Sequence, residues 1–180
     1  MRLRWRHPFE PRRVRAVEPK LVDANAFKAV MRTWASGVTI LTSVVDDQIH
    51  GMTVSAFSSV SAQPPLVLVC ANQASFTHEV IASSGVFGVN VLAAGQEEIS
   101  NRFAMGDAAH RFDGVPWSAG ETGAPLLDGA LSSLECRVRS SHHEGTHTIY
   151  IGEVLASHVR EGAAPLVYFD GTYRALAAKG

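Results

Sequence analysis

Several features are scarce or missing in this chain of 180 residues, and each absence excludes a class of protein. No apolar run approaches the roughly 18 residues of a membrane-spanning helix, so we expect no membrane insertion. Cys70 and Cys136 are the only cysteines and form no C-x-x-C pair, which excludes a zinc finger and a thioredoxin-type redox pair. Glycine and proline occur at ordinary frequencies, which excludes collagen-like and low-complexity chains.

Two well-known catalytic and nucleotide-binding motifs are also absent. No G-x-G-x-x-G follows a predicted strand, so a Rossmann dinucleotide-binding domain is not indicated. No G-x-S-x-G elbow is present, so an α/β-hydrolase is unsupported. The length and the apolar fraction of 46% instead fit one globular domain that needs no disulfide or metal to fold. Both cysteines lie in apolar, strand-like runs, and we expect a reducing, cytoplasmic location.

The net charge of −1 is unevenly distributed along the chain. Residues 1–20 carry seven basic and two acidic groups, a balance of +5, and the remaining nine basic and fifteen acidic groups give −6. A basic segment of this kind either binds nucleic acid or an acidic surface, or is a solvated tail. We interpret residues 1–20 as a disordered extension of a domain at 21–180, and we expect no nucleic-acid partner. The segment lacks the apolar region of a secretory signal.

Hydrophobic periodicity predicts a chain that is rich in strands. Helices are predicted at 23–34, 75–83 and 96–105. Strands are predicted at 38–45, 66–70, 86–91, 133–139, 148–154, 166–169 and 173–176, and the run 49–60 is rich in small hydroxylated residues. The continuous apolar run at 66–70 favours burial on both faces, and the glycine-rich segment 106–129 is predicted to be loop. Roughly seven strands with three short helices predict a mainly β fold, a β-barrel with flanking helices.

The segment Gly51–Ser61, GMTVSAFSSVS, is unusual for a strand because small hydroxylated residues surround one large side chain, Phe57. Small residues allow a ligand to approach the backbone closely, and hydroxyls add adaptable hydrogen bonds. Such a wall suits a flat ring with polar edges, such as a flavin. A plain packing strip of small residues is the alternative.

The segment Asn72–His78, NQASFTH, places Ser75 and Thr77 at the start of a predicted helix. Free N–H groups and the helix dipole favour an anion such as phosphate at that position. Ordinary N-capping by a serine or threonine side chain is the alternative.

Histidines and aromatic residues mark two further segments. His142, His143 and His147 are predicted on a loop that leads into a strand, where their spacing does not place two ligands on one helix face, so we expect no metal site. A histidine there is better suited to donate a hydrogen bond or present a charge to a phosphate-bearing substrate. In Arg111–Trp117, RFDGVPW, the two aromatic side chains either stack on a ligand or pin the loop to the core.

Seven motifs in this order resemble the short-chain flavin reductase family, the NADH-dependent reductase partners of two-component flavin-dependent monooxygenases. The resemblance extends from about Ala26 to Ala175 and leaves only the basic segment uncovered. The motifs are SGVTILT (Ser36–Thr42), GMTVSAFSSVS, PPLVLVC (Pro64–Cys70), FGVNVL (Phe87–Leu92), RFDGVPW, THTIYIGEV (Thr146–Val154) and PLVYFDGTYR (Pro165–Arg174).

The resemblance implies an FMN-binding split β-barrel, a homodimer, and binding of FMN or FAD. The family's isoalloxazine wall corresponds to Thr53–Ser59, its ring and ribityl contacts to Cys70–Asn72, and its phosphate contacts to the segment around Ser75 and Thr77. The flavin-binding residues implied in this way, with the aromatic candidate of the later loop, are Ala35, Ser36, Thr53, Val54, Ser55, Ala56, Phe57, Ser58, Ser59, Cys70, Ala71, Asn72, Ser75, Phe76, Thr77 and Phe112.

For the nicotinamide nucleotide, the resemblance implies contacts from His147, Tyr173 and Arg174. The family often has an acidic residue before that histidine, whereas Thr146 stands here. The implied activity is hydride transfer from NAD(P)H, with NADH favoured, to FAD or FMN, which then passes reduced to a partner monooxygenase. A pyridoxamine-phosphate-oxidase-like FMN enzyme and a non-catalytic flavin-binding protein are the alternatives.

Overall fold

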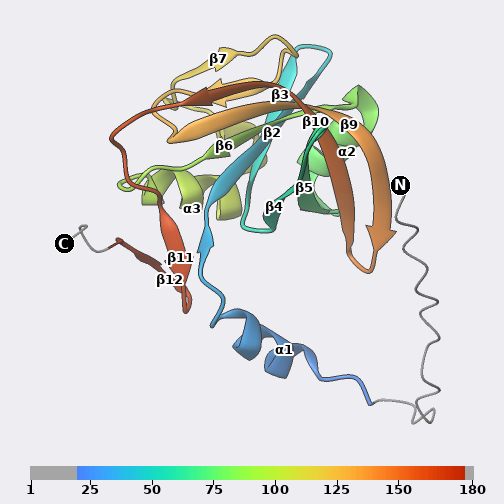
Figure 1. Ribbon diagram of the computed structural model, residues 1–180, viewed down its shortest axis with the longest axis vertical. Helices are drawn as coiled ribbons and strands as arrows, with labels where there is room; N and C mark the ends of the chain where they lie inside the picture. The colour runs from blue at the N-terminus through green and yellow to red at the C-terminus, as the bar shows by residue number, and fades with distance from the viewer. Residues whose placement is uncertain (1–19, 177–180) are drawn as a thin grey trace, which may run out of the picture.

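An antiparallel sheet of seven strands forms the body of the protein, in the spatial order β3-β2-β6-β9-β10-β5-β4 (Figure 1). The computed structural model describes residues 20–176, so the predicted basic extension lies outside the described part except for Lys20. The strands of this sheet are β2 (Thr39–Val45), β3 (Gln48–Val54), β4 (Phe57–Ala62), β5 (Pro65–Asn72), β6 (Val86–Val91), β9 (Ser132–Glu144) and β10 (His147–Val159).

Two small sheets and three α-helices surround the large sheet. One small sheet holds β1 (Ser36–Gly37), β11 (Val167–Phe169) and β12 (Thr172–Arg174), and the other holds β7 (Trp117–Ala119) and β8 (Pro125–Leu127). The helices are α1 (Ala24–Met31), α2 (Phe76–Ser84), α3 (Glu97–Met105) and the short 3₁₀ helix η1 (Ala108–His110). The prediction of a mainly β fold with flanking helices is therefore confirmed. Within residues 20–176, no helix has the length and apolar character needed to cross a membrane.

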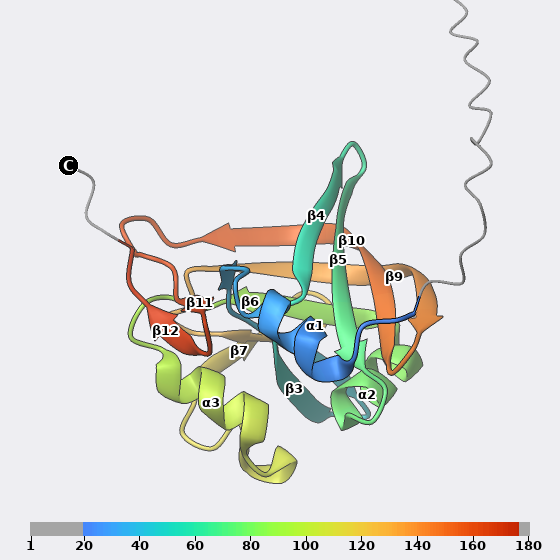
Figure 2. The same cartoon turned by 90° about the horizontal axis from the view of Figure 1, so that it is seen from below.

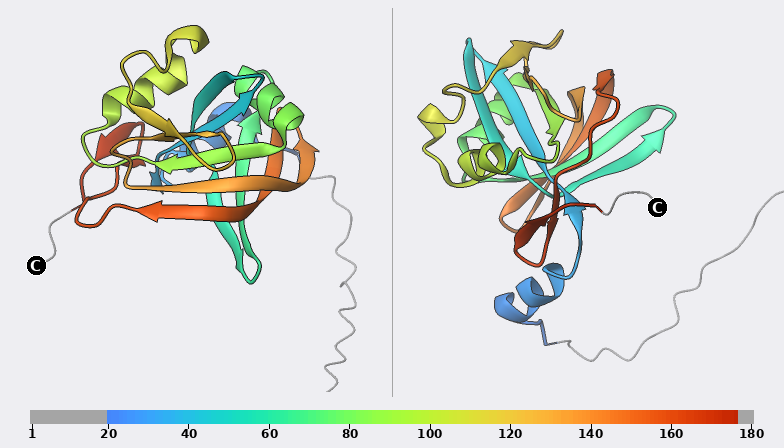
Figure 3. Two further views of the ribbon diagram at one scale, coloured as in Figure 1. Left: turned by 90° about the horizontal axis from the view of Figure 1, so that it is seen from above. Right: turned by 90° about the vertical axis from the view of Figure 1, so that its left-hand side faces the viewer.

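The long strands β9 and β10 give the sheet its curvature (Figures 1 and 3). Their pairing shifts register between Ile151 and Gly152 and again between Val154 and Ala156. Each such bulge adds local twist and bends the strand pair, which lets the sheet curve around its core. The β4–β5 hairpin projects from this body (Figure 2), and α1 lies apart from the large sheet (Figure 1).

Two apolar clusters fill the interior. The first joins side chains from β2, β5, β6 and α2, and includes Leu41, Val69, Ile81 and Phe87. The second lies toward α3 and includes Ile40, Leu92, Phe103 and Leu166. Leu41 and Ile40 are adjacent on β2 and point to opposite faces, so one strand with two buried faces joins both clusters.

The structure completes one prediction and corrects another in the first half of the chain. The run 49–60, rich in small hydroxylated residues, belongs to two strands, β3 and β4, which lie at opposite edges of the large sheet and are separated at Ser55 and Ala56. The run 66–70 belongs to the longer β5, whose side chains alternate between buried and more exposed positions. The prediction that the run 66–70 is buried on both faces is therefore wrong, because its apolar residues also occupy the half-buried face of this strand.

Two segments predicted as loop also contain regular structure. The segment 106–129 includes η1 and the β7–β8 pair. His142 and His143 lie on β9, and His147 begins β10 after a tight turn, so the histidines belong to a hairpin. The hairpin signal was missed because polar residues occupy its exposed end, where neither face is buried.

Candidate functional site

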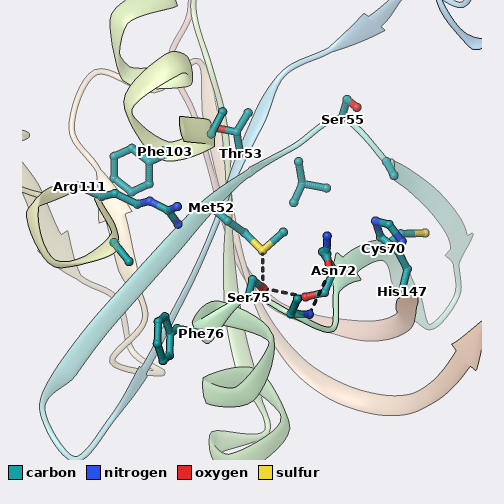
Figure 4. Close-up of a pocket in the computed structure, with 15 residues that line it drawn as sticks. Met52, Thr53, Ser55, Cys70, Asn72, Ser75, Phe76, Phe103, Arg111 and His147 are labelled. Carbon is teal, nitrogen blue, oxygen red and sulfur yellow. Dashed lines mark hydrogen bonds between the residues drawn. The ribbon is translucent and has the colours of Figure 1, made fainter. Parts of the chain in front are cut away.

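A cleft of about 570 Å³ opens where the chain leaves β3, a size that is typical of small-molecule sites (Figure 4). Its walls come from the end of β3, the β5–α2 junction, the start of β10, and the region from α3 to η1. The residues that line it are Met52, Thr53, Val54, Ser55, Ala56, Cys70, Asn72, Ala74, Ser75, Phe76, Phe103, Ala104, Ala108, Arg111 and His147.

Many residues predicted from the sequence meet in this cleft. They are Thr53, Val54, Ser55, Ala56, Cys70, Asn72, Ser75, Phe76 and His147. An adjoining cavity shares Ser55 and Ala56 with the cleft and adds Ser36, Phe57 and Ser58. A third cavity shares Thr53 and Ser55 and adds Tyr173. The three cavities therefore meet along one wall of small residues at the end of β3.

The remaining predicted residues do not line these cavities. Ala71 and Thr77 are buried, and Thr77 is only 1% exposed. Phe112 packs edge-on against Phe103, with ring centroids 4.9 Å apart, which favours the interpretation that this aromatic residue pins its loop to the core. The others are exposed to solvent elsewhere: Ala35, Ser59 and Arg174.

The small-residue wall is held from behind by hydrogen bonds to α3. Thr53 Oγ1 donates to the carbonyl of Ser100 at 2.6 Å. Tyr173 O–H lies 2.9 Å from Ser100 Oγ and 2.7 Å from Asn101 Oδ1. Opposite them, the backbone N–H of Cys70 donates to the carbonyl of Ala56 at 3.0 Å. These bonds fix the backbone on both sides of the strand break.

The start of α2 forms the floor of the cleft. Ser75 is the N-cap, and its hydroxyl oxygen accepts from the N–H of His78 at 3.2 Å, so the predicted capping role is present. Asn72 Oδ1 accepts from the N–H of Ala74 at 2.9 Å and shapes the turn into the helix. Because Ala74, Ser75 and Phe76 all line the cleft, the positive end of the helix dipole faces it.

Arg111 is a cleft residue that the sequence interpretation missed. Its guanidinium donates to the carbonyl of Gly51 from Nη1 at 2.7 Å and to the carbonyl of Gly106 from Nε at 3.2 Å. A Cβ at Gly51 would lie 2.7 Å from the Phe103 ring, so only glycine fits here. Burial lowers the pKa of Arg111, and the charge of Asp107 partly offsets this. The side chain stays a cation, since arginine does not lose its proton in proteins.

No carboxylate within the described residues forms an ion pair with Arg111. The cation is thus held in place by two neutral carbonyls and remains available to an anion. The sequence prediction for this loop concerned only its aromatic residues, whereas the residue that lines the cleft is the arginine that opens the RFDGVPW motif.

At the other end of the cleft, His147 begins β10 with its side chain exposed (Figure 4). Thr146 Oγ1 lies 3.0 Å from His147 Nδ1, so the threonine side chain contacts the ring of the histidine that follows it. Gln73 Nε2 donates to the backbone carbonyl of His147 at 2.9 Å. The histidine is therefore held through its ring and through its backbone.

The protein-family model of the flavin reductase-like domain matches residues 31–177, which is most of the chain. This protein belongs to the flavin reductase-like family. The FMN reductase (NADH) RutF of Stutzerimonas stutzeri is 39% identical over 153 residues, covering 84% of this chain and 88% of the relative. The flavin-dependent monooxygenase reductase subunit HsaB of Rhodococcus jostii is 35% identical over 162 residues, covering 89% and 82%.

A solved structure extends the likeness to three dimensions. The NADH:FAD oxidoreductase SgcE6 of Streptomyces globisporus, in complex with NAD and FAD fragments, superimposes on this flavin reductase-like chain with a TM-score of 0.81. The two are 35% identical, and the match covers 88% of this chain and 98% of the other. The split β-barrel fold is thus common to both.

The residues of the cleft fit a flavin mononucleotide or dinucleotide. A flat ring needs a wall without bulky side chains, which Thr53, Ser55 and Ala56 provide. A phosphate needs positive charge and free donors, which Arg111 and the start of α2 provide.

Proposed function

We propose that this protein is an NADH:flavin oxidoreductase that supplies reduced FMN or FAD to a separate monooxygenase. The flavin, when bound, accepts a hydride from NADH. The observation that carries the proposal is a single cleft that joins a fixed cation, a wall of small residues and an exposed histidine. The names of its relatives support the same activity.

The protein's own residues bind and orient the two reactants. Arg111 and the N–H groups at the start of α2 hold the phosphate, and the wall from Thr53 to Ala56 accepts the ring. With a flavin bound, backbone N–H groups along that wall would stabilise negative charge on the ring. His147 orients the nicotinamide nucleotide, and Tyr173 binds it from β12, next to the exposed Arg174.

We also propose that the protein forms a homodimer in the cytoplasm. Helix α1 exposes large apolar side chains, and Trp34, just beyond the helix, is 70% exposed. The exposed apolar residues of this segment are Phe27, Val30, Met31 and Trp34. A second copy of the chain would cover this surface, since apolar patches on soluble proteins mark interfaces. Sedimentation of wild type and Trp34→Glu tests it, and a monomeric wild type would contradict it.

The activity is tested by following NADH and NADPH oxidation with free FMN, FAD or riboflavin as acceptor. We expect NADH to be oxidised much faster with protein and flavin together than with either alone. Flavin binding without turnover would identify a carrier protein. Oxidation of pyridoxamine phosphate without NADH consumption would identify the alternative FMN enzyme.

A further inference from the structure

A chain of hydrogen bonds lies behind the tip of the β9–β10 hairpin and ends at the backbone of His147. His78 Nε2 on α2 lies 2.9 Å from Thr148 Oγ1 on β10, which in turn lies 3.1 Å from His143 Nδ1 on β9. The same Nδ1 lies 3.3 Å from Gln73 Nε2, which also donates to the carbonyl of His147. Three secondary-structure elements and one loop are thus joined behind the cleft.

The donors around His143 Nδ1 determine which tautomer satisfies all of these contacts. The amide nitrogen of Gln73 can only donate, so His143 Nδ1 must accept and cannot carry a proton. Thr148 then gives its hydroxyl proton to the same Nδ1 lone pair, which it shares with Gln73 in a three-centre arrangement, and its oxygen accepts from His78 Nε2–H. Thr148 is 1% exposed, so water does not replace these partners. The network therefore exists only when the His143 imidazole is neutral with its proton on Nε2.

We propose that His143 is a positioning residue whose neutral imidazole holds Gln73, and through it the backbone of His147, in place for the nicotinamide nucleotide. This inference rests on the proposed function, because His147 has no role without NADH. A proton on His143 Nδ1 removes the acceptor that Gln73 and Thr148 share. Gln73 then loses one of the two contacts that orient its amide, so the hairpin tip is held less firmly and NADH binding weakens as the pH falls.

The titratable groups around His143 come from α2, β9 and β10. His78 faces His143 from α2 with ring centroids 6.5 Å apart, and Glu79 follows it on the helix. His147 lies on β10, and His142 and Glu144 flank His143 on its own strand. Burial and the charge of His143 lower the pKa of His78, while Glu79 raises it. The lowered pKa keeps His78 neutral to a lower pH than an unperturbed histidine, so it donates Nε2–H to Thr148 as a neutral ring.

The test compares His143→Asn with His143→Ala. The Oδ1 of asparagine takes the place of Nδ1, accepts the same two hydrogen bonds and does not titrate. KM for NADH and kcat are measured between about pH 5 and about pH 8, where histidines titrate. Saturating FAD is the acceptor, because the phosphate monoester of FMN titrates near pH 6.

For the wild type, we expect KM for NADH to rise roughly two- to tenfold on acidification, as expected for the loss of one or two hydrogen bonds. His143→Asn should keep the low KM throughout, whereas His143→Ala and Gln73→Ala should have the high KM at every pH. The kcat and the thermal midpoint should change little. His142→Ala, on the same strand and outside the network, serves as the matched control.

Two outcomes overturn the inference. An acid rise in KM that persists in His143→Asn assigns the titration to another group, and an unchanged KM in His143→Ala removes the positioning role. Both require active enzyme, so they are distinguishable from failure of the proposed function, in which no variant and no wild-type protein oxidises NADH with any flavin.

Discussion

The two ends of the cleft hold their polar groups by different means. At one end, the Arg111 guanidinium is fixed by two backbone carbonyls, and its charge is permanent. At the other end, His147 is held through Thr146 and Gln73, in contact with a network that needs a neutral histidine. Flavin binding should therefore be insensitive to the protonation of this protein, whereas binding of the nicotinamide nucleotide should depend on it.

The largest expected effect is at the arginine end. Arg111→Ala should weaken FMN binding by roughly 10- to 100-fold, the range for losing a hydrogen bond to a charged group. Riboflavin lacks the phosphate, so its binding should change little. Fluorescence titration with both flavins measures the difference, and Arg111→Lys is the control that keeps the charge. Equal losses for FMN and riboflavin would show that Arg111 only supports the fold of its loop.

The next effect is at the histidine end. His147→Ala should raise KM for NADH by roughly threefold to tenfold, because the side chain is exposed and one hydrogen bond is lost. The Kd for FMN should stay near that of the wild type. Steady-state kinetics and flavin titration on the same preparation test this. Weaker flavin binding with an unchanged KM for NADH would reverse the assignment of the two ends.

A smaller effect should appear in stability at the histidine end. Burial, with a contribution from His143, lowers the pKa of His78 in the folded state. The unfolded chain therefore binds the proton more readily. The folded state keeps its full stability above the pKa that His78 has in the unfolded chain, and loses stability as the pH falls toward the lower pKa of the folded state. When the pH is lowered from about 7.5 to about 5.5, the thermal midpoint should fall less in His78→Gln than in the wild type. An equal fall in both proteins would contradict this.

The smallest effect concerns the rate at which the two cysteines are modified, since one lies in the cleft wall and the other in the core. Cys70 is half-buried in the cleft wall, whereas burial and the nearby Glu135 raise the pKa of Cys136 to about 12. Iodoacetamide should modify Cys70 slowly, because burial also raises its pKa, and FMN should slow the reaction further. Mass spectrometry of the modified protein, with and without FMN, tests this. Cys136 modification in the folded protein, or no protection of Cys70, would contradict it.

The sequence predicted the parts of the site that depend on local pattern. Small residues around Ser55 marked the wall, and a serine at a helix start marked the floor, because both signals lie within a few residues. The break between β3 and β4 was missed, since Ser55 and Ala56 carry no turn signal and their strands separate only in the folded sheet.

Residues that act through distant partners were not predictable in this way. Arg111 gains its position from the carbonyl of Gly51, which lies 60 residues earlier in the chain. His143 gains its role from Gln73, 70 residues earlier. No periodicity or motif spacing records such contacts, because they depend on how the strands pair.

The most direct test of the two-ended cleft is a crystal structure of the protein with bound FMN. We expect the phosphate to lie within hydrogen-bond distance of the Arg111 guanidinium and the first N–H groups of α2, with the ring along Thr53–Ala56. A phosphate bound at His147, with the ring against Arg111, would contradict it.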